Sequence, residues 1–177
     1  MLNNGLQRKL TGNSKMKRAL TYDFDDPDSF FRISGQAQGA DYTRFAFGND
    51  DGDMLEVDVS ALMGDVKTID CLTCHPVEMP LAFPSLESLF KVRAFVFAPE
   101  FLNEDGSEYR DVFRVVFDRR KLCVLFTDNL DKITSYYAED RIVYYLHRGF
   151  VVAIEIQNLT EKEYLTIKNK PRGWVTH

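Results

Sequence analysis

The residues of this chain whose types and spacing could do chemistry are gathered in the stretch CLTCHP, residues 71–76. Cys71, Cys74 and His75 form a C-x-x-C-H motif, which is the spacing that attaches a c-type haem. Haem attachment also requires export to an oxidising compartment in most systems, and we find no secretory signal in the sequence. The motif follows an expected strand and meets Pro76, which is a poor setting for a large apolar haem pocket. We therefore expect no haem.

Zinc is a less demanding alternative, because Cys71 and Cys74 have the spacing of one half of a tetrahedral site. A second C-x-x-C is absent from the sequence. Cys123 lies inside the apolar run LCVLF, where a thiol is typically a small core side chain. The sequence therefore predicts no metal and no cofactor, and a metal-stabilised structural module built on Cys71 and Cys74 stays as an alternative. The other candidate ligands are His75, His147 and His177.

Carboxylates are concentrated in two short runs, at residues 23–28 and 50–53. Such oxygen clusters can bind Ca²⁺ or Mg²⁺, but NDDGD lacks EF-hand spacing with a closing Glu at the twelfth position. The favoured interpretation is that both runs are solvated turns whose charge is available to a protein partner. The candidate partner-binding residues are Asp23, Asp25, Asp26, Asp28, Asp50, Asp51 and Asp53.

The composition is typical of a globular protein, with 45% hydrophobic and 28% charged residues in a chain of 177. The aromatic share of 13% is high, and aromatic residues favour strands. No run approaches the roughly 18 apolar residues that a membrane helix needs. Three cysteines are too few for a disulfide framework and fit a reducing compartment. We expect a cytoplasmic protein that does not associate with a membrane.

The charge of the chain is unevenly distributed. The first twenty residues carry five cations and no acid, while the whole chain has a formal net charge of −5, so residues 21–177 carry a formal −10. That charge opposes phosphate, and Arg119, Arg120 and Lys121 form only one short basic turn. The sequence therefore predicts no direct nucleic-acid binding by the body of the protein.

Periodicity predicts that the body consists mostly of strands. A helix start is expected at Asp26-Pro27-Asp28-Ser29, followed by the short turn FFRIS. Strands are predicted at residues 19–24, 42–47, 54–59, 67–72, 92–97, 112–117, 122–126, 133–137, 142–146 and 150–156. The strand 122–126 is apolar at every position, which indicates that both of its faces are covered.

Two further signals concern helices and the connection between the halves. Thr160 and Glu163 form a capping box ahead of a C-terminal helix near 161–169. Pro76, Pro80 and Pro84 interrupt regular structure, so residues 76–84 are expected to form a crossover, followed by a short helix in SLESLF. The fold class predicted is α+β, a single domain dominated by an antiparallel β-sheet meander with a few short helices.

The domain organisation expected is a basic, disordered N-terminal tail at residues 1–16 and one α+β domain at 17–177. The sequence contains no G-x-S-x-G, HExxH, G-x-G-x-x-G or phosphate-binding glycine loop. Its three histidines are a small supply of general bases. These observations favour a non-enzymatic protein without settling the question.

An acidic, aromatic-rich β protein without an evident catalytic motif suits a protein that acts through its surface. We expect an acidic protein-binding factor, an inhibitor or immunity-type protein that masks a basic partner such as a nuclease or a nucleic-acid-binding protein. The alternative is a small enzyme or ligand-binding domain whose pocket is built from scattered residues. The oligomeric state does not follow from the sequence.

Overall fold

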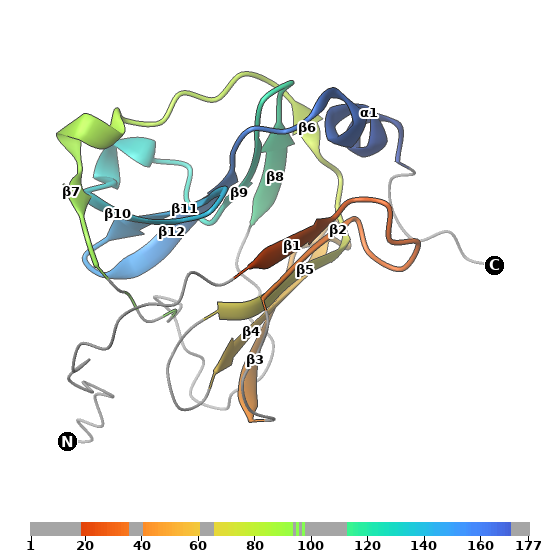
Figure 1. Ribbon diagram of the computed structural model, residues 1–177, viewed down its shortest axis with the longest axis horizontal. Coiled ribbons are helices and arrows are strands. Elements are labelled where there is room, and N and C mark those ends of the chain that lie inside the picture. The colour runs from red at the N-terminus through yellow and green to blue at the C-terminus, as the bar shows by residue number, and fades with distance from the viewer. Residues whose placement is uncertain are drawn as a thin grey trace.

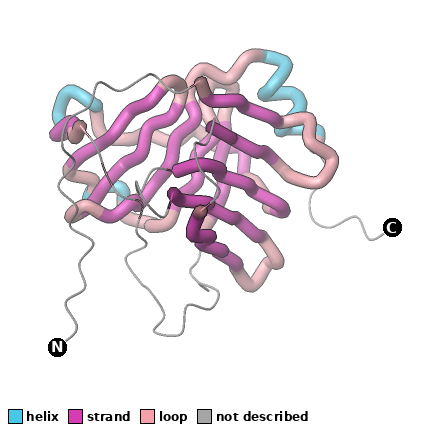
Figure 2. Tube along the Cα trace, turned by 60° about the horizontal axis from the view of Figure 1, so that its bottom comes forward, coloured by secondary structure: helices cyan, strands magenta, loops and turns pink. Residues whose placement is uncertain are grey.

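The computed structural model describes residues 19–35, 41–60, 66–93, 95, 97 and 113–170. Two β-sheets and one C-terminal helix account for most of this part of the chain (Figure 1). The helical segments are short, and strands dominate the trace (Figure 2). The α+β fold class predicted from the sequence is confirmed. The basic tail predicted for residues 1–16 lies outside the described residues.

The first half of the chain forms a five-stranded sheet in which all neighbouring strands are antiparallel. Its spatial order is β1 (Leu20–Asp23), β2 (Phe31–Gly35), β5 (Val66–Thr73), β4 (Met54–Ser60) and β3 (Tyr42–Gly48).

The second half forms a seven-stranded sheet whose central strands are antiparallel and whose two-residue edge strands β6 and β7 are parallel to their neighbours. Two short 3₁₀ helices, η1 (Leu86–Ser88) and η2 (Leu130–Lys132), lie in its connections. The spatial order is β6 (Val77–Glu78), β8 (Arg114–Phe117), β9 (Leu122–Leu125), β12 (Phe150–Ile156), β11 (Ile142–His147), β10 (Ser135–Glu139) and β7 (Phe90–Lys91).

The inner faces of both sheets contribute to one continuous apolar core. Phe31 and Leu55 from the five-stranded sheet and Leu122 and Ile154 from the seven-stranded sheet are completely or almost completely buried in it. Burial of a large apolar side chain contributes about 1.5–3 kcal/mol, so this shared core is the main reason that the two sheets stay together.

The outer face of the seven-stranded sheet is covered by the segment that follows β6. Leu81, Phe83, Leu86 and Leu89 pack on a second apolar cluster there, and the Phe83 ring stacks on Tyr145 with centroids 4.2 Å apart. Side chains of β9 alternate between the two clusters, because Leu122 and Val124 enter the core while Cys123 and Leu125 enter the second cluster. The prediction that both faces of this strand are covered is confirmed.

Three local predictions were wrong. Asp26-Pro27-Asp28-Ser29 forms a turn instead of starting a helix, and FFRIS continues as strand β2. The alternation in β2 explains this, because Phe31 and Ile33 are buried while Arg32 and Ser34 are partly exposed. In the segment 92–97, the described residues form no strand, and the short strand β7 precedes them.

The C-terminal helix α1 (Glu161–Asn169) has the predicted bounds. Its capping box is formed as expected, since Thr160 accepts a hydrogen bond from the Glu163 amide and Glu163 accepts one from the Thr160 amide. Tyr164 and Ile167 enter the core. Within the part of the chain that is described, no helix has the length and apolar character needed to span a membrane.

The capping box also involves Arg141, which donates from both terminal nitrogens to the Glu163 carboxylate at 2.9 Å. Burial acts to raise the pKa of Glu163, but the bonds from Arg141 and Thr160 outweigh it and hold this pKa below its ordinary value of 4.5. The carboxylate is therefore stabilised in its charged form by folding.

We expect Glu163→Gln to lower the free energy of unfolding at pH 7 by about 1–2 kcal/mol, since the amide keeps part of the cap but loses the charge. A carboxyl group with a depressed folded-state pKa contributes fully above its unfolded value, and the contribution is lost as the pH falls through the folded-state pKa. Denaturant unfolding between pH 7 and about pH 3 should show the two proteins converging in acid. A difference that stays constant over this range would contradict the assignment.

Candidate functional site

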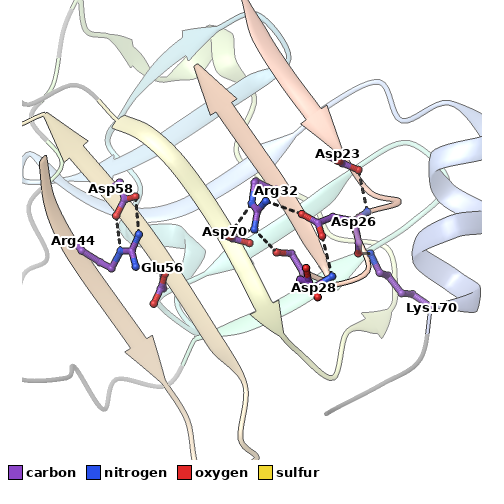
Figure 3. A network of polar contacts seen from close by, with 10 residues as sticks. Asp23, Asp26, Asp28, Arg32, Arg44, Glu56, Asp58, Asp70 and Lys170 are labelled. Atoms are coloured by element: carbon purple, nitrogen blue, oxygen red, sulfur yellow. Dashed lines mark hydrogen bonds and ion pairs between the residues drawn. The ribbon is translucent and has the colours of Figure 1, made fainter. Parts of the chain in front are cut away.

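The outer face of the five-stranded sheet, which is turned away from the core, carries the densest set of charged contacts in the described residues (Figure 3). Strand β4 shows why, because Leu55 and Val57 are buried in the core and alternate with Glu56 and Asp58. Successive side chains of a strand point to opposite faces of the sheet. The same alternation in β5 places Asp70 on the outer face.

The strand register arranges these outer side chains in two rows across the sheet. One row contains Asp23, Arg32, Asp70, Glu56 and Ala46, and the other contains Thr21, Ser34, Thr68, Asp58 and Arg44. With Asp26 from the β1–β2 loop, the charged members are five carboxylates and two guanidinium groups, which gives a formal charge of −3. We call this set the acidic face: Asp23, Asp26, Arg32, Arg44, Glu56, Asp58 and Asp70.

Arg32 is the centre of one half of the acidic face. Its Nε and Nη2 both lie 2.8 Å from Oδ2 of Asp70, and its Nη1 lies 2.7 Å from Oδ2 of Asp26. Nη2 also donates to the Ser29 hydroxyl at 3.0 Å. The hydrogen bond to Asp70 raises the pKa of Arg32, while desolvation acts in the opposite direction. Arg32 therefore fixes the loop side chains Asp26 and Ser29 against strand β5.

Arg44 is the centre of the other half. It forms a bidentate pair with Asp58, with Nε–Oδ1 at 2.8 Å and Nη2–Oδ2 at 3.1 Å. Its Nη1 lies 3.0 Å from Oε2 of Glu56. The bond to Asp58 raises the pKa of Arg44 above its ordinary value, although desolvation opposes it. Asp58 is therefore held by two contacts and Glu56 by one.

One buried side-chain atom of the acidic face has no hydrogen-bond partner among the described residues. This atom is Oδ1 of Asp70, which accepts no hydrogen bond from the described part of the chain, although Oδ2 of the same carboxylate receives Arg32. Glu56 lies directly across from Asp70 in the register of β4 and β5. Like charges directly opposite one another on a sheet are destabilising, so this pair is an unfavourable feature of the free protein.

The first predicted acidic run lies in the β1–β2 loop, and most of its carboxylates have partners within the protein. Asp23 accepts hydrogen bonds from the amides of Asp25 and Asp26. Asp25 lies 3.0 Å from Nζ of Lys162, and this bond lowers the pKa of Asp25. Asp28 is exposed at the end of the run. The carboxylates thus organise the β1–β2 loop, and fewer of them are left without a partner in the protein than the sequence predicted.

Lys170 closes this loop from the end of α1. Its ammonium group donates to three backbone carbonyl oxygens, those of Phe24 at 2.9 Å, Asp26 at 2.8 Å and Phe30 at 3.1 Å. Desolvation lowers the pKa of Lys170, while Asp26 and the other loop carboxylates act in the opposite direction. Three converging carbonyls around one ammonium fix the path of the loop relative to the helix.

The second predicted acidic run lies in the β3–β4 turn. Asn49 organises this turn, because its Oδ1 accepts from the amides of Asp51 and Asp53 at 3.0 and 2.9 Å. Gly52 has a positive φ of 81°, which a residue without a Cβ adopts readily. Asp50 and Asp51 are exposed, as the turn predicted.

Asp53 differs from the other members of this run, because it is only 5% exposed. Its Oδ1 lies 2.6 Å from Nδ1 of His75, and its Oδ2 accepts from the Asn49 side chain at 2.9 Å. The His75 side chain is about half exposed. The expectation of a solvated carboxylate therefore fails for Asp53, because the turn folds it back toward the end of β5. The contact between Asp53 and His75 attaches the β3–β4 turn to the segment that follows β5.

The cysteines of the C-x-x-C-H motif lie in the core. Cys71 and Cys74 are buried, and burial together with a hydrogen bond between the two thiols raises the pKa of Cys74. A thiol with a raised pKa stays protonated and is a poor metal ligand. Within the described residues, no three His, Cys, Asp or Glu side chains are placed to hold a metal ion together.

The remaining candidate ligands lie elsewhere. Cys123 is buried in the second apolar cluster, and burial raises its pKa. His147 pairs through Nδ1 with the carbonyl of Lys132 at 2.6 Å. His177 lies outside the described residues. The C-x-x-C-H motif is therefore a pair of core thiols followed by a histidine that binds Asp53.

The sequence reasoning missed Glu56, Asp58 and Asp70 because it searched for local runs of acidic residues. These three are separated in sequence by hydrophobic residues and are brought together by strand pairing. A signal was present in MLEVDVS, where Glu56 and Asp58 alternate with core residues, and in VKTIDCLT, where Asp70 lies between the core residues Ile69 and Cys71.

Comparison with known proteins does not supply a function. No protein-family model matches the chain, and no curated protein matches its sequence. What this protein does must therefore be argued from the chemistry of its own residues.

Proposed function

We propose that this chain is a non-enzymatic protein-binding factor that masks a basic partner, in the manner of an inhibitor or immunity-type protein. The observation that supports the proposal is the acidic face, on which five carboxylates and two guanidinium groups share the outer side of one sheet. Nucleases and nucleic-acid-binding proteins have the basic surfaces that such a face would complement. The three free thiols suit a cytoplasmic setting.

The arrangement of the face suits specific binding better than a flexible acidic loop would. Arg32 and Arg44 hold their carboxylates at fixed positions before a partner arrives, which reduces the entropy lost on binding. Tyr42 is half exposed at the end of β3, with the Arg44 guanidinium 5.6 Å from the centre of its ring. An exposed tyrosine next to ordered charges is a typical anchor of a protein interface.

The experiment begins with affinity capture of the tagged protein in its source cells and identification of the stoichiometric partner. Association and dissociation rates of the purified pair are then measured between about 50 and about 300 mM NaCl. Because salt screens charges at the rim of an interface, we expect the association rate to fall about tenfold and the dissociation rate to change less. An association rate that does not depend on salt would overturn the proposal.

Two matched variants test the charge directly. Asp50→Asn/Asp51→Asn neutralises the exposed β3–β4 turn beside the acidic face, and Glu87→Gln/Asp131→Asn removes the same charge from η1 and η2 on the other sheet. We expect the first variant to slow association several-fold and the second to leave it nearly unchanged. Equal effects would show that net charge acts without a defined surface.

The second candidate function is enzymatic and rests on the Asp53–His75 pair. A buried carboxylate that binds Nδ1 of a half-exposed imidazole is an arrangement that orients a general base. Capture of a small metabolite in place of a stoichiometric protein would favour this alternative. The pair also joins the β3–β4 turn to the chain after β5.

A further inference from the structure

The acidic face contains one place where the protein's own charges are not balanced, between Asp70 and Glu56. The two carboxylates are cross-strand neighbours on β5 and β4. The guanidinium groups lie on the outer sides of this pair, with Arg32 next to Asp70 and Arg44 next to Glu56. A negative centre flanked by two cations is the result.

The unpartnered oxygen is an atom of Asp70, one of the two members of this pair. Asp70 is 9% exposed, and its Oδ1 accepts no hydrogen bond from any residue that the structure describes. A buried acceptor without a partner loses its hydrogen bonds to water without replacement, and native proteins retain few such groups. Four of the five N–H donors of Arg32 are directed to Oδ2 of Asp70, to Asp26 and to Ser29. The free protein therefore leaves an acceptor that an incoming donor can satisfy.

Glu56 is the side chain that can make room for such a donor. Among the described residues, Glu56 forms one ion pair, to Nη1 of Arg44, whereas Asp58 keeps Arg44 in place through two bonds. When Glu56 turns away from Arg44, the bidentate pair between Arg44 and Asp58 remains intact. Release of Glu56 therefore disrupts a single contact of the network.

We propose that the partner inserts an arginine side chain between Glu56 and Asp70, so that its guanidinium binds the Glu56 carboxylate and Oδ1 of Asp70. Neighbouring strands lie about 4.8 Å apart, and a planar guanidinium with five donors can bridge carboxylates on both. An ammonium group is a compact charge without this fork, so arginine is favoured over lysine. The inference rests on the proposed function and identifies the surface and the partner's chemistry.

The test uses a short, blocked peptide of alternating arginine and threonine and a matched peptide of alternating lysine and threonine. Their Kd values are measured by fluorescence anisotropy at about 50 mM NaCl for the wild type, Glu56→Gln and Asp70→Asn, with Glu87→Gln, at an exposed residue of η1, as the charge-matched control. We expect the arginine peptide to bind more tightly than the lysine peptide. We expect the Kd of the arginine peptide to rise about tenfold for each face variant and less than about twofold for the control.

A second measurement does not depend on whether the variants fold well. Amide chemical shifts of the wild-type protein are followed while the arginine peptide is added, and we expect the largest changes at residues 54–58 and 68–72. Changes confined to the β1–β2 loop or the β3–β4 turn would overturn the site. So would equal affinity of the face variants and the control, no preference for arginine, or no binding of the peptide.

These outcomes separate the two proposals. One outcome is that the Kd of the arginine peptide is the same for the wild type, Glu56→Gln and Asp70→Asn while the captured partner still associates in a salt-dependent way. In that case the site is wrong and the proposed function stands. If the captured partner associates independently of salt, the proposed function fails, whatever the peptide does.

Discussion

Replacing Asp53 with alanine should lower the free energy of unfolding by about 3 kcal/mol. The carboxylate is buried and is bonded on one oxygen by His75 at 2.6 Å and on the other by Asn49 at 2.9 Å. Removing one partner of a buried polar pair leaves the other groups without their bonds, at a cost of about 3–5 kcal/mol when both partners are fully buried. The half-exposed His75 can bind water in place of the lost carboxylate, so we expect a loss of unfolding free energy at the lower end of this range.

The neighbouring Asp51 provides the control for this prediction. Asp51→Ala makes the same chemical change in the same turn, but its side chain is exposed, so we expect less than about 0.5 kcal/mol. Urea unfolding of the two variants, with His75→Ala and the double variant of Asp53 and His75, gives the coupling energy of the pair. Equal losses for Asp51→Ala and Asp53→Ala would show that the contact with His75 does not stabilise the fold.

The elements that the sequence predicted well are those whose signals are local. The capping box fixed the start of α1, since Thr160 and Glu163 satisfy each other's amides within one turn. The apolar run of β9 indicated a strand covered on both faces, because neither face could be left in water. The bounds of β12, Phe150–Ile156, were also predicted correctly from alternation.

The errors occurred where contacts distant in sequence decide the structure. The Asp-Pro pair at residues 26–27 has the local chemistry of a helix start, but β2 pairs with both β1 and β5 and takes Phe31 and Ile33 into the core. Long-range pairing therefore outweighed the local preference. The division into two sheets was also missed, because the pattern of one strand does not show which strand it pairs with.

The sequence indicated that the candidate site is acidic, but it identified only some of the residues of the acidic face. Asp23 and Asp26 belong to the acidic face, whereas Glu56, Asp58 and Asp70 enter it through strand register. Asp53, which looked like part of an exposed run, is buried by His75. A run of acidic residues gives the local charge density, while the tertiary fold decides which carboxylates share a surface.

The helix and the acidic face are connected by Lys170, and Lys170→Met should lower the free energy of unfolding by about 2–3 kcal/mol. The ammonium group donates to the carbonyls of Phe24, Asp26 and Phe30. Bonds of this charged kind contribute about 1.5–3 kcal/mol each, and the desolvation that lowers the pKa of Lys170 offsets part of the sum. Methionine keeps an unbranched side chain of similar length, so the loss reports the ammonium group.

Lys162→Met is the matched control, because it removes the same charge from the same helix. Lys162 is 82% exposed and, within the described residues, binds the exposed Asp25 alone, so its loss should cost less than about 0.5 kcal/mol. Hydrogen exchange adds a local readout, since the Phe30 amide donates to the Cys71 carbonyl and should exchange faster in Lys170→Met alone. If the two variants were equally stable and Phe30 stayed protected in both, the carbonyls around Lys170 would not be holding the loop. Asp26 would then reach Arg32 without help from the helix, and the order of the acidic face would come from its own ion pairs alone.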